Sequence, residues 1–263
     1  MKGDVVISVR GLRNQFGEQV VHDRLDLDIY AGEVLGIVGG SGTGKSVLLR
    51  TILGLNKPAV GRIEIFGKAR SEMTQAEEHA VERRWGVLFQ DGALFSSLTV
   101  AQNIQVALKE HLHLPQGLMD EIAALKIALV GLPPDAAPKF PSELSGGMRK
   151  RAGLARALAL DPEIVFLDEP TSGLDPIGAS AFDELIKNLQ ATLGLTVFMV
   201  THDLDSLYAI CDRIAVLAEK RVLVTGTIQD MLTQEHPWIR EYFHGPRGRA
   251  AMAAKAQPPR SRD

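Results

Sequence analysis

The chain has 263 residues, of which 45% are hydrophobic, and it carries a formal net charge of −3. This length and composition allow one sizeable core, which favours a single α/β domain with a small subdomain over two separate domains. The slightly acidic balance argues against a protein that works by neutralising a phosphate backbone, so we expect no nucleic-acid partner. The single cysteine, Cys211, excludes an intramolecular disulfide and suits a reducing compartment.

Short apolar segments of two kinds predict two kinds of β-sheet. Three segments alternate apolar and polar side chains, which is typical of strands with one buried face, and we expect them to form an antiparallel layer. Three others are apolar without alternation, and each precedes a turn and a helical pattern, which indicates a parallel sheet buried on both faces. The alternating segments are residues 5–9, 25–29 and 63–65, and the continuous ones are residues 34–38, 164–167 and 197–200.

The middle of the chain has a helical pattern punctuated by prolines. Within residues 120–130, the apolar residues at 122, 125, 129 and 130 recur with helical spacing, and prolines between 133 and 141 mark a rigid connector. We therefore predict a helical subdomain at about residues 91–160, inserted into the core. Two later strands, at residues 214–217 and 222–224, predict a closing hairpin.

The end of the chain differs in composition from the rest. Residues 246–263 are rich in Pro and Ala and carry five cations against one acid. This composition predicts a flexible basic tail that follows a folded domain of residues 1–245. The cations are Arg247, Arg249, Lys255, Arg260 and Arg262, and the acid is Asp263.

A glycine-rich loop follows the strand of residues 34–38 and precedes a helical segment. Its sequence fits G-x-x-x-x-G-K-[ST], in which glycines let the backbone curl around an anion while N–H groups and the helix dipole point at phosphate oxygens. We predict that Lys45 reaches the β and γ phosphates of ATP and that the Ser46 hydroxyl is a ligand of Mg²⁺. The predicted phosphate-binding residues are Gly39, Gly40, Ser41, Gly42, Thr43, Gly44, Lys45 and Ser46.

Two adjacent acids, Asp168 and Glu169, follow the apolar strand of residues 164–167. The carboxyl ends of parallel strands form the edge at which ligands bind in open sheets. Because neighbouring strand residues point to opposite sides, one acid can serve the metal while the other serves a different target. We assign Asp168 to the Mg²⁺ shell and Glu169 to activation of the attacking water as general base.

A second glycine turn opens another helix. This run, Leu144-Ser145-Gly146-Gly147-Met148, resembles the signature motif of ATP-binding cassette (ABC) ATPases, in which the fifth residue is usually Gln. A Ser-Gly-Gly turn at a helix N-terminus is a further anion site. Because one phosphate needs only one binding loop, this second site must serve a second nucleotide. In the ABC family two ATPase domains face each other head to tail. The resemblance implies that Ser145, Gly146 and Gly147 cover the γ-phosphate held by the opposite subunit.

Four further positions match the ABC family in their order along the chain. Gln90 corresponds to the glutamine that contacts metal and water, and His202 to the histidine that contacts the γ-phosphate. Asp175 lies in a segment, residues 172–175, that resembles the loop contacting the opposite subunit. Phe16 stands where the family has an aromatic residue that stacks on adenine, although Tyr is commoner there. The resemblance therefore covers most of the chain.

The chain is similar to the Mla-type branch, the ATPases of bacterial phospholipid-trafficking systems with Mce proteins, at residues 89–100, 107–111 and 141–148, including Met148. This resemblance implies a homodimer that uses ATP and Mg²⁺ to energise phospholipid trafficking through an integral membrane permease, with Mce-type and small accessory subunits as further partners. It implies a peripheral position on the cytoplasmic side of the bacterial inner membrane. No stretch of about 18 consecutive apolar residues is present, which agrees with a peripheral position.

The expected fold is an α/β P-loop NTPase (RecA-like) core with an antiparallel β subdomain and an inserted α-helical subdomain. The main alternative function is the ATPase subunit of an importer for amino acids or other small solutes. A DNA-repair or chromosome-organising ATPase would need a long coiled coil between the P-loop and the signature, and the chain has neither the room nor the heptads. An inactive nucleotide-binding regulator is disfavoured because Lys45, Asp168, Glu169 and His202 are all present.

Overall fold

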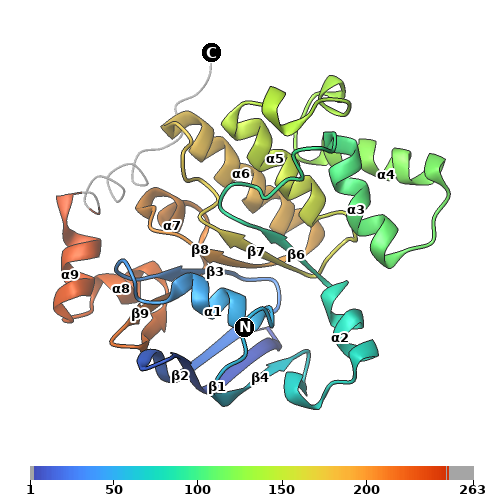
Figure 1. Ribbon diagram of the computed structural model, residues 1–263. Helices are drawn as coiled ribbons and strands as arrows, with labels where there is room; N and C mark the ends of the chain where they lie inside the picture. Colours follow the sequence, from blue (N-terminus) through green and yellow to red (C-terminus); the bar gives the residue numbers. More distant parts are fainter. Residues whose placement is uncertain (1–2, 247, 249–263) are drawn as a thin grey trace.

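The computed structural model describes residues 3–246 and 248. The chain forms two β-sheets and several groups of helices (Figure 1). The strands are β1 (Val5–Phe16), β2 (Gln19–Tyr30), β3 (Val34–Val38), β4 (Val60–Ile65), β5 (Lys68–Ala69), β6 (Trp85–Leu88), β7 (Ile164–Asp168), β8 (Thr196–Val200), β9 (Arg213–Ala218) and β10 (Arg221–Gly226). The α-helices are α1 (Lys45–Ile52), α2 (Gln75–Glu82), α3 (Val100–His111), α4 (Gln116–Leu129), α5 (Gly146–Ala157), α6 (Pro176–Leu193), α7 (Leu204–Ile210), α8 (Ile228–Leu232) and α9 (Pro237–His244). Three short 3₁₀ turns are η1 (Arg70–Glu72), η2 (Pro134–Ala136) and η3 (Pro141–Glu143).

A six-stranded sheet in the order β10-β9-β3-β8-β7-β6 forms the centre of the molecule. Strands β3, β8, β7 and β6 pair in parallel, and every residue of β3, β7 and β8 is buried. Successive residues of β7 serve opposite faces: Ile164 and Phe166 join the core shared with α1, whereas Val165 and Leu167 join the core shared with α6. These contacts confirm the predicted parallel sheet and explain why its strands show no alternation.

A second sheet, in the order β2-β1-β4-β5, is antiparallel and confirms the predicted alternating strands. Its inward residues, such as Ile7, Leu27 and Ile65, share a core with Leu48 and Leu49 of α1. Helix α1 therefore lies between the two sheets (Figure 1). The glycine-rich loop that precedes α1 is held by this arrangement at one edge of the parallel sheet.

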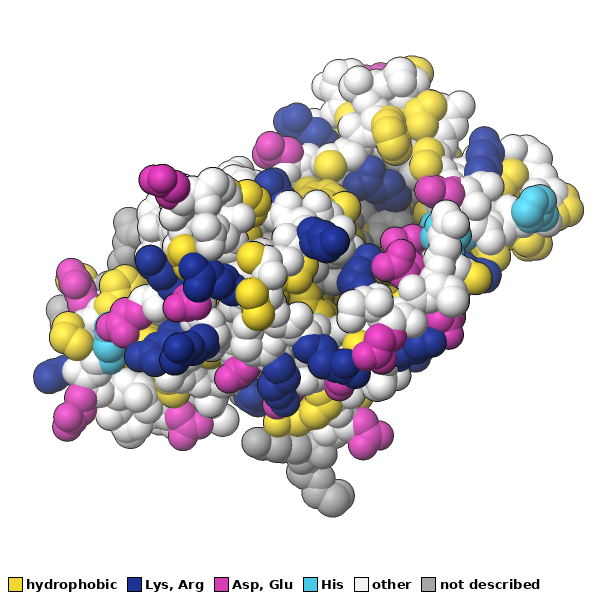
Figure 2. Space-filling model, turned by 60° about the horizontal axis from the view of Figure 1, so that its bottom comes forward, with side chains coloured by type: hydrophobic (Ala, Val, Ile, Leu, Met, Phe, Trp, Pro, Cys, Tyr) yellow, Lys and Arg dark blue, Asp and Glu magenta, His cyan; other side chains and the backbone are white. Residues whose placement is uncertain are grey.

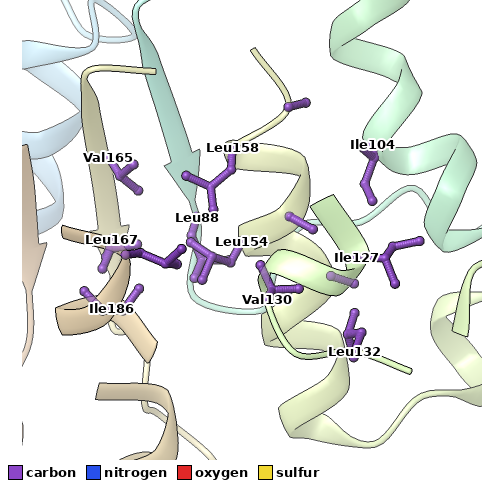
Figure 3. Packing of buried hydrophobic residues seen from close by; sticks show 14 of the residues in the cluster. Leu88, Ile104, Ile127, Val130, Leu132, Leu154, Leu158, Val165, Leu167 and Ile186 are labelled. Carbon is purple, nitrogen blue, oxygen red and sulfur yellow. The ribbon is translucent and has the colours of Figure 1, made fainter. Parts of the chain in front are cut away.

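Helices α3, α4 and α5 form a layer beside the parallel sheet, within the range predicted to be helical (Figure 1). Leu154 of α5 and Ile127 of α4 pack in one core with Leu88 of β6 and Leu167 of β7 (Figure 3). One expected apolar position differs, since Leu125 is 62% exposed. The buried residues of α4 include Met119, Ala123 and Ile127, whose spacing of four residues places them on one face of the helix.

The C-terminal part contains the predicted hairpin, in which β9 and β10 pair antiparallel. Its two turn residues, Glu219 and Lys220, both have positive φ, which matches the twist of a two-residue hairpin turn. In the part of the chain that the structure describes, every helix is too short or too polar to cross a membrane. Apart from Pro246 and Gly248, the predicted basic tail lies outside the described residues.

Candidate functional site

The glycine-rich loop, residues 39–46, joins β3 to α1 and curls tightly enough to exclude side chains at two positions. A Cβ at Gly39 would lie 2.3 Å from the Leu217 carbonyl oxygen, and one at Gly44 would lie 2.5 Å from Nε2 of the buried His22. Gly44 also has φ +96, a conformation that other residues rarely adopt. Helix α1 begins directly after it, so the helix N-terminus and its N–H groups face the loop.

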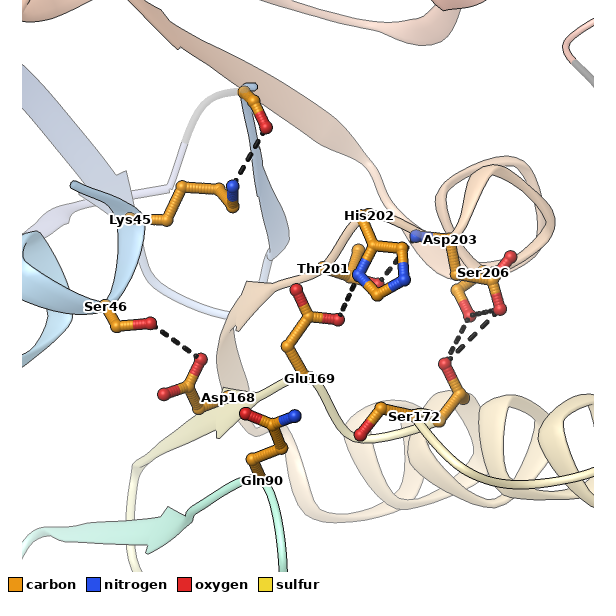
Figure 4. Close-up of polar contacts among 12 residues, drawn as sticks. Lys45, Ser46, Gln90, Asp168, Glu169, Ser172, Thr201, His202, Asp203 and Ser206 are labelled. Carbon is orange, nitrogen blue, oxygen red and sulfur yellow. Dashed lines mark hydrogen bonds and ion pairs between the residues drawn. The ribbon is translucent and has the colours of Figure 1, made fainter. Parts of the chain in front are cut away.

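Lys45 spans this loop with its side chain. Its Nζ donates hydrogen bonds to the Gly39 carbonyl at 2.8 Å and to the Gly40 carbonyl at 3.1 Å (Figure 4). Burial lowers the pKa of Lys45, whereas the nearby charges of Glu169 and Asp168 raise it. The ammonium group is therefore held inside the cradle in which the sequence places the β and γ phosphates.

Ser46 and Asp168 meet beside the loop, because α1 begins there and β7 ends there. The Ser46 hydroxyl donates to Asp168 Oδ1 at 3.3 Å (Figure 4). Burial raises the pKa of Asp168, and the hydrogen bond from Ser46 lowers it. A hydroxyl and a carboxylate side by side next to a phosphate cradle are the oxygen donors that Mg²⁺ takes in nucleotide sites, so these residues fit that metal.

Glu169 and His202 lie opposite each other at the ends of β7 and β8. His202 Nδ1 is 2.6 Å from Glu169 Oε2 (Figure 4). The Glu169 backbone N–H donates to the Val200 carbonyl at 2.8 Å. Glu169 has φ +50, a strained conformation that costs on the order of 1 kcal/mol or more and is typical of functional positions. Both residues line a cavity of about 440 Å³ together with Thr171, Ser172, Gly173, Asp203, Leu204 and Asp205.

The predicted signature turn caps a helix and faces solvent. The Met148 N–H donates to Ser145 Oγ at 3.2 Å, and both Ser145 and Gly146 are exposed. A Cβ at Gly147 would lie 3.9 Å from Leu174, so the turn lies beside the loop of residues 172–175. The turn is not among the residues that line the cavity at Glu169 and His202.

Three other predicted residues occupy exposed positions. Gln90 follows β6, which pairs with β7, and Figure 4 shows its side chain near Asp168. Asp175 caps α6, where its Oδ1 accepts a hydrogen bond from the Gly178 N–H at 2.8 Å. Phe16 ends β1 and is 49% exposed, which leaves its ring accessible for stacking.

The structure adds two residues that the sequence motifs did not indicate. Lys150, on α5, donates to the carbonyls of Gln90 and Glu169. Tyr242, on α9, donates from its hydroxyl to the His202 carbonyl at 3.0 Å. Residues four apart lie on the same face of a helix, so the spacing between Lys150 and Leu154 indicates that this cation lies on the buried face of α5. Tyr242 gives no such signal, because its contact joins distant parts of the chain.

Residues 22–172 of the chain match the family described as ABC transporter. The chain belongs to the ABC transporter ATP-binding family. This ABC ATPase is 42% identical over 243 residues to "Probable ribonucleotide transport ATP-binding protein mkl" of Mycobacterium leprae, covering 92% of this chain and 70% of the relative. It is 38% identical over 240 residues to "Intermembrane phospholipid transport system ATP-binding protein MlaF" of Haemophilus influenzae, covering 91% of this chain and 90% of the relative.

Solved structures of ABC ATPases share the fold of this one. The protein cbiO1 of Clostridium perfringens, part of the transporter complex cbiONQ, superposes with a TM-score of 0.79 at 28% identity, covering 96% of this chain and 99% of that chain. The cassette MJ0796, in a dimeric post-hydrolysis state bound to ADP and phosphate, gives a TM-score of 0.76 at 28% identity, covering 84% of this chain and 98% of that chain. These matches confirm the predicted fold class and the assignment of this ABC ATPase as an ATP-hydrolysing enzyme.

Proposed function

We propose that this ABC ATPase works as a head-to-tail homodimer on the cytoplasmic side of the bacterial inner membrane, where ATP hydrolysis energises phospholipid trafficking through a permease. The observation that carries the catalytic proposal is the convergence of three strand ends on one sheet edge. The P-loop follows β3, Asp168 ends β7 and is followed by Glu169, and His202 follows β8 (Figure 4). These ends bring together a phosphate cradle, a metal-binding acid and a base.

Each of these groups has a separate part in holding the substrate. The N–H groups of the P-loop and the ammonium of Lys45 bind the β and γ phosphates, and the ring of Phe16 stacks on adenine. Ser46, Asp168 and Gln90 would hold Mg²⁺, which when bound would neutralise charge on the phosphate oxygens. The hydrogen bond between Ser46 and Asp168 already brings two of these three ligands together.

Hydrolysis requires a water held in line with the γ-phosphorus. Glu169 accepts a proton from this water while the oxygen of the water bonds to phosphorus. The bond between phosphorus and the bridging oxygen breaks, which leaves ADP and phosphate. His202, held 2.6 Å from Glu169 and anchored through its carbonyl by Tyr242, contacts the γ-phosphate. Glu169, which has a positive φ, lines the cavity that it shares with His202.

The proposed dimer rests on surface features beside the site. Ser145 and Gly146, at the N-terminus of α5, are exposed to solvent. The free N–H groups at a helix N-terminus favour binding of an anion. Next to the loop that ends at Asp175, the large apolar side chain of Ile177 is 84% exposed. An opposite subunit would place the γ-phosphate of its bound ATP at Ser145. The same subunit would cover the exposed side chain of Ile177. The dimeric state described for the cassette MJ0796 supports this arrangement.

Composite sites can be tested by complementation between two inactive variants. Ser145→Arg damages the signature turn, and Lys45→Ala damages the P-loop, so each homodimer should be inactive. A mixed dimer of the two, purified with distinct tags, contains one intact site if each site takes its P-loop from one subunit and its signature from the other. We expect close to half of the wild-type ATPase rate. An inactive mixed dimer would show that each subunit builds its own site.

The reciprocal dimer provides the matched control for this experiment. Here both substitutions lie in one subunit, and its companion is wild type. With composite sites, both sites are damaged and the rate should be near background. If each subunit instead worked alone, the wild-type subunit would retain its activity, which would contradict the head-to-tail arrangement.

A groove between the core and the helical layer fits a membrane partner. It measures about 400 Å³, and its lining includes Leu55, Phe89 and Phe95 among apolar residues of both layers. Leu55 and Phe95 are 62% and 51% exposed. The loop that carries Phe95 is fixed by the buried Asn103, whose amide donates to the carbonyls of Phe95, Leu98 and Thr99. A rigid, partly apolar hollow is suited to receive a helix of a permease.

The surface of the molecule carries both positive and negative side chains on the face that Figure 2 shows. The face drawn in Figure 2 is hollowed, with hydrophobic side chains scattered among cations and carboxylates. The groove itself is also lined by Glu82, Glu110 and Arg156, so a permease helix with an apolar face and charged flanks would match it. In the proposed assembly, Mce-type and small accessory subunits join this ATPase by binding to the permease.

Two sets of relatives suggest different cargoes. The mkl proteins are named for ribonucleotide transport, and the MlaF proteins for intermembrane phospholipid transport. We favour phospholipid because the MlaF alignment covers 90% of that relative and 91% of this chain, and because residues 89–100, which include Phe95 of the groove, are similar to the Mla-type branch. Import of small solutes is the alternative that the experiment must distinguish.

The cargo is tested with the complex purified from its own membrane through a tag on this chain. Reconstituted into donor liposomes, it should move a fluorescent phospholipid to acceptor particles only with ATP and only with Glu169 intact. The measurement is the ATP-dependent rate of phospholipid transfer, compared between wild type and Glu169→Gln. Copurification of an amino-acid-binding subunit, with no phospholipid transfer, would favour the importer instead.

A further inference from the structure

Lys150 is a buried cation beside the proposed site, and none of the motifs assigns it a role. It lies on α5 and is only 5% exposed. Its Nζ donates to the Gln90 carbonyl, to the Glu169 carbonyl at 2.9 Å and to Ser172 Oγ at 3.3 Å. An ammonium has three donors, so these three acceptors use all of them.

The three acceptors belong to three different parts of the molecule. Gln90 lies in the segment that leads from β6 into the helical layer, Glu169 directly follows strand β7, and Ser172 belongs to the loop that precedes Asp175. Lys150 itself follows the signature turn on α5. One ammonium therefore connects the signature helix to the two backbone positions that carry the proposed water-activating and metal-binding side chains.

Glu169 in particular depends on such contacts. Its φ of +50 is unfavourable for a residue with a side chain, and both of its backbone groups are fixed by hydrogen bonds. The N–H donates to Val200, and the carbonyl accepts from the Ser172 N–H at 3.2 Å and from Lys150. Without Lys150, the carbonyl would lose its charge-assisted bond and the peptide could relax away from the conformation that aims the carboxylate at the cavity.

We propose that Lys150 is a positioning residue for ATP hydrolysis, which holds the backbones of Gln90 and Glu169 so that their side chains meet the same nucleotide. This inference rests on the proposed role of Glu169 as general base. Burial lowers the pKa of Lys150, whereas the charges of Asp91, Glu169 and Asp168 raise it.

Lys150→Met tests this role, because it keeps an unbranched buried side chain but removes the donors. Since a small misplacement of catalytic groups can lower turnover by up to about 100-fold, we expect kcat for ATP to fall by about 10-fold or more. The KM for Mg·ATP should change by less than about twofold, because Lys150 makes no contact with the P-loop. Lys150→Gln, which keeps one short donor, should show an intermediate kcat and serves as the second variant if Lys150→Met does not fold.

Lys126→Met is the matched control. Lys126 is another buried lysine of the helical layer, 3% exposed, but its Nζ bonds to Asp161 at 2.5 Å and to neither Gln90 nor Glu169. It should lower the melting temperature without a comparable loss of kcat. Equal losses of kcat in the two variants, or a rise in KM that accounts for the whole effect of Lys150→Met, would overturn the proposal.

A double substitution separates positioning from general damage. If Lys150 acts partly through Gln90, Lys150→Met should lower kcat less in a Gln90→Ala background than in the wild type, because effects within one unit are not additive. Full additivity would contradict this route. Glu169→Gln is measured alongside: if it retains turnover, the general-base proposal fails, whereas its inactivity together with a wild-type kcat for Lys150→Met would sink the Lys150 proposal alone.

Discussion

Replacing Glu169 with glutamine should nearly abolish ATP turnover while leaving ATP binding intact. The amide has almost the shape of the carboxylate but cannot accept the proton of the attacking water, and loss of a general base typically lowers rates by about 10²–10⁴-fold. Because hydrolysis is what would reopen the proposed dimer, an ATP-bound dimer should accumulate. The measurements are steady-state phosphate release and the elution volume of the protein with Mg·ATP.

Glu163→Gln is a suitable control for the same chemical change. Glu163 precedes the other end of β7, where it forms an exposed ion pair with Arg84 at 2.6 Å, far along the strand from the catalytic edge. Its loss should leave turnover close to wild type, since exposed pairs contribute little. Normal phosphate release by Glu169→Gln would remove Glu169 from its assigned role, and Asp168 would then be the next candidate to examine.

Lys45→Ala should weaken nucleotide binding by about 10- to 100-fold, on the basis of about 1.5–3 kcal/mol for a hydrogen bond to a charged group. The substitution removes the only side-chain cation that the structure describes within the P-loop, residues 39–46. It also removes the bonds from Nζ to the carbonyls of Gly39 and Gly40, so the loop itself loses a brace. Calorimetric titration with Mg·ATP gives the affinity, and circular dichroism establishes that the variant is folded.

Lys187→Ala separates this effect from a general change of charge. Lys187 lies on α6, where its Nζ donates to the Ala209 carbonyl at 3.4 Å outside the P-loop. It should leave the affinity for Mg·ATP unchanged. A folded Lys45→Ala variant with wild-type affinity would contradict the phosphate-cradle assignment, whatever the result at Glu169.

The parts of the fold that sequence predicted are those that local pattern controls. Alternation indicates one buried face and its absence indicates two, so β1, β2 and β4 of one sheet and β3, β7 and β8 of the other were identifiable without knowledge of their neighbours. The P-loop was predictable because its tight backbone requires glycine at positions such as Gly39 and Gly44, and because Lys45 completes a motif with known phosphate chemistry. Leu125 shows the limit, because helical spacing alone does not say which face of α4 the neighbouring helices cover.

The contacts that complete the site depend on tertiary structure. His202 and Glu169 could be named separately from the sequence, but their separation of 2.6 Å follows from the pairing of β7 with β8. Lys150 and Tyr242 act on the backbone carbonyls of other segments, and a carbonyl carries no sequence signal. Such supports appear only once the segments are placed in space.

The order of strands in the central sheet also constrains how the chain is made. β3, which leads into the P-loop, pairs with β8 on one side and with β9 on the other, and both partners lie near the opposite end of the chain. Non-local pairings of this kind are slow to form, because a long loop must close before any contact rewards it. During synthesis the apolar strand β3 leaves the ribosome before β8 and β9. It can pair with them only after both have been synthesised. We therefore expect the nucleotide cradle to form only after β8 and β9 have been synthesised, and a nascent chain that ends before β8 to expose an unpaired strand edge.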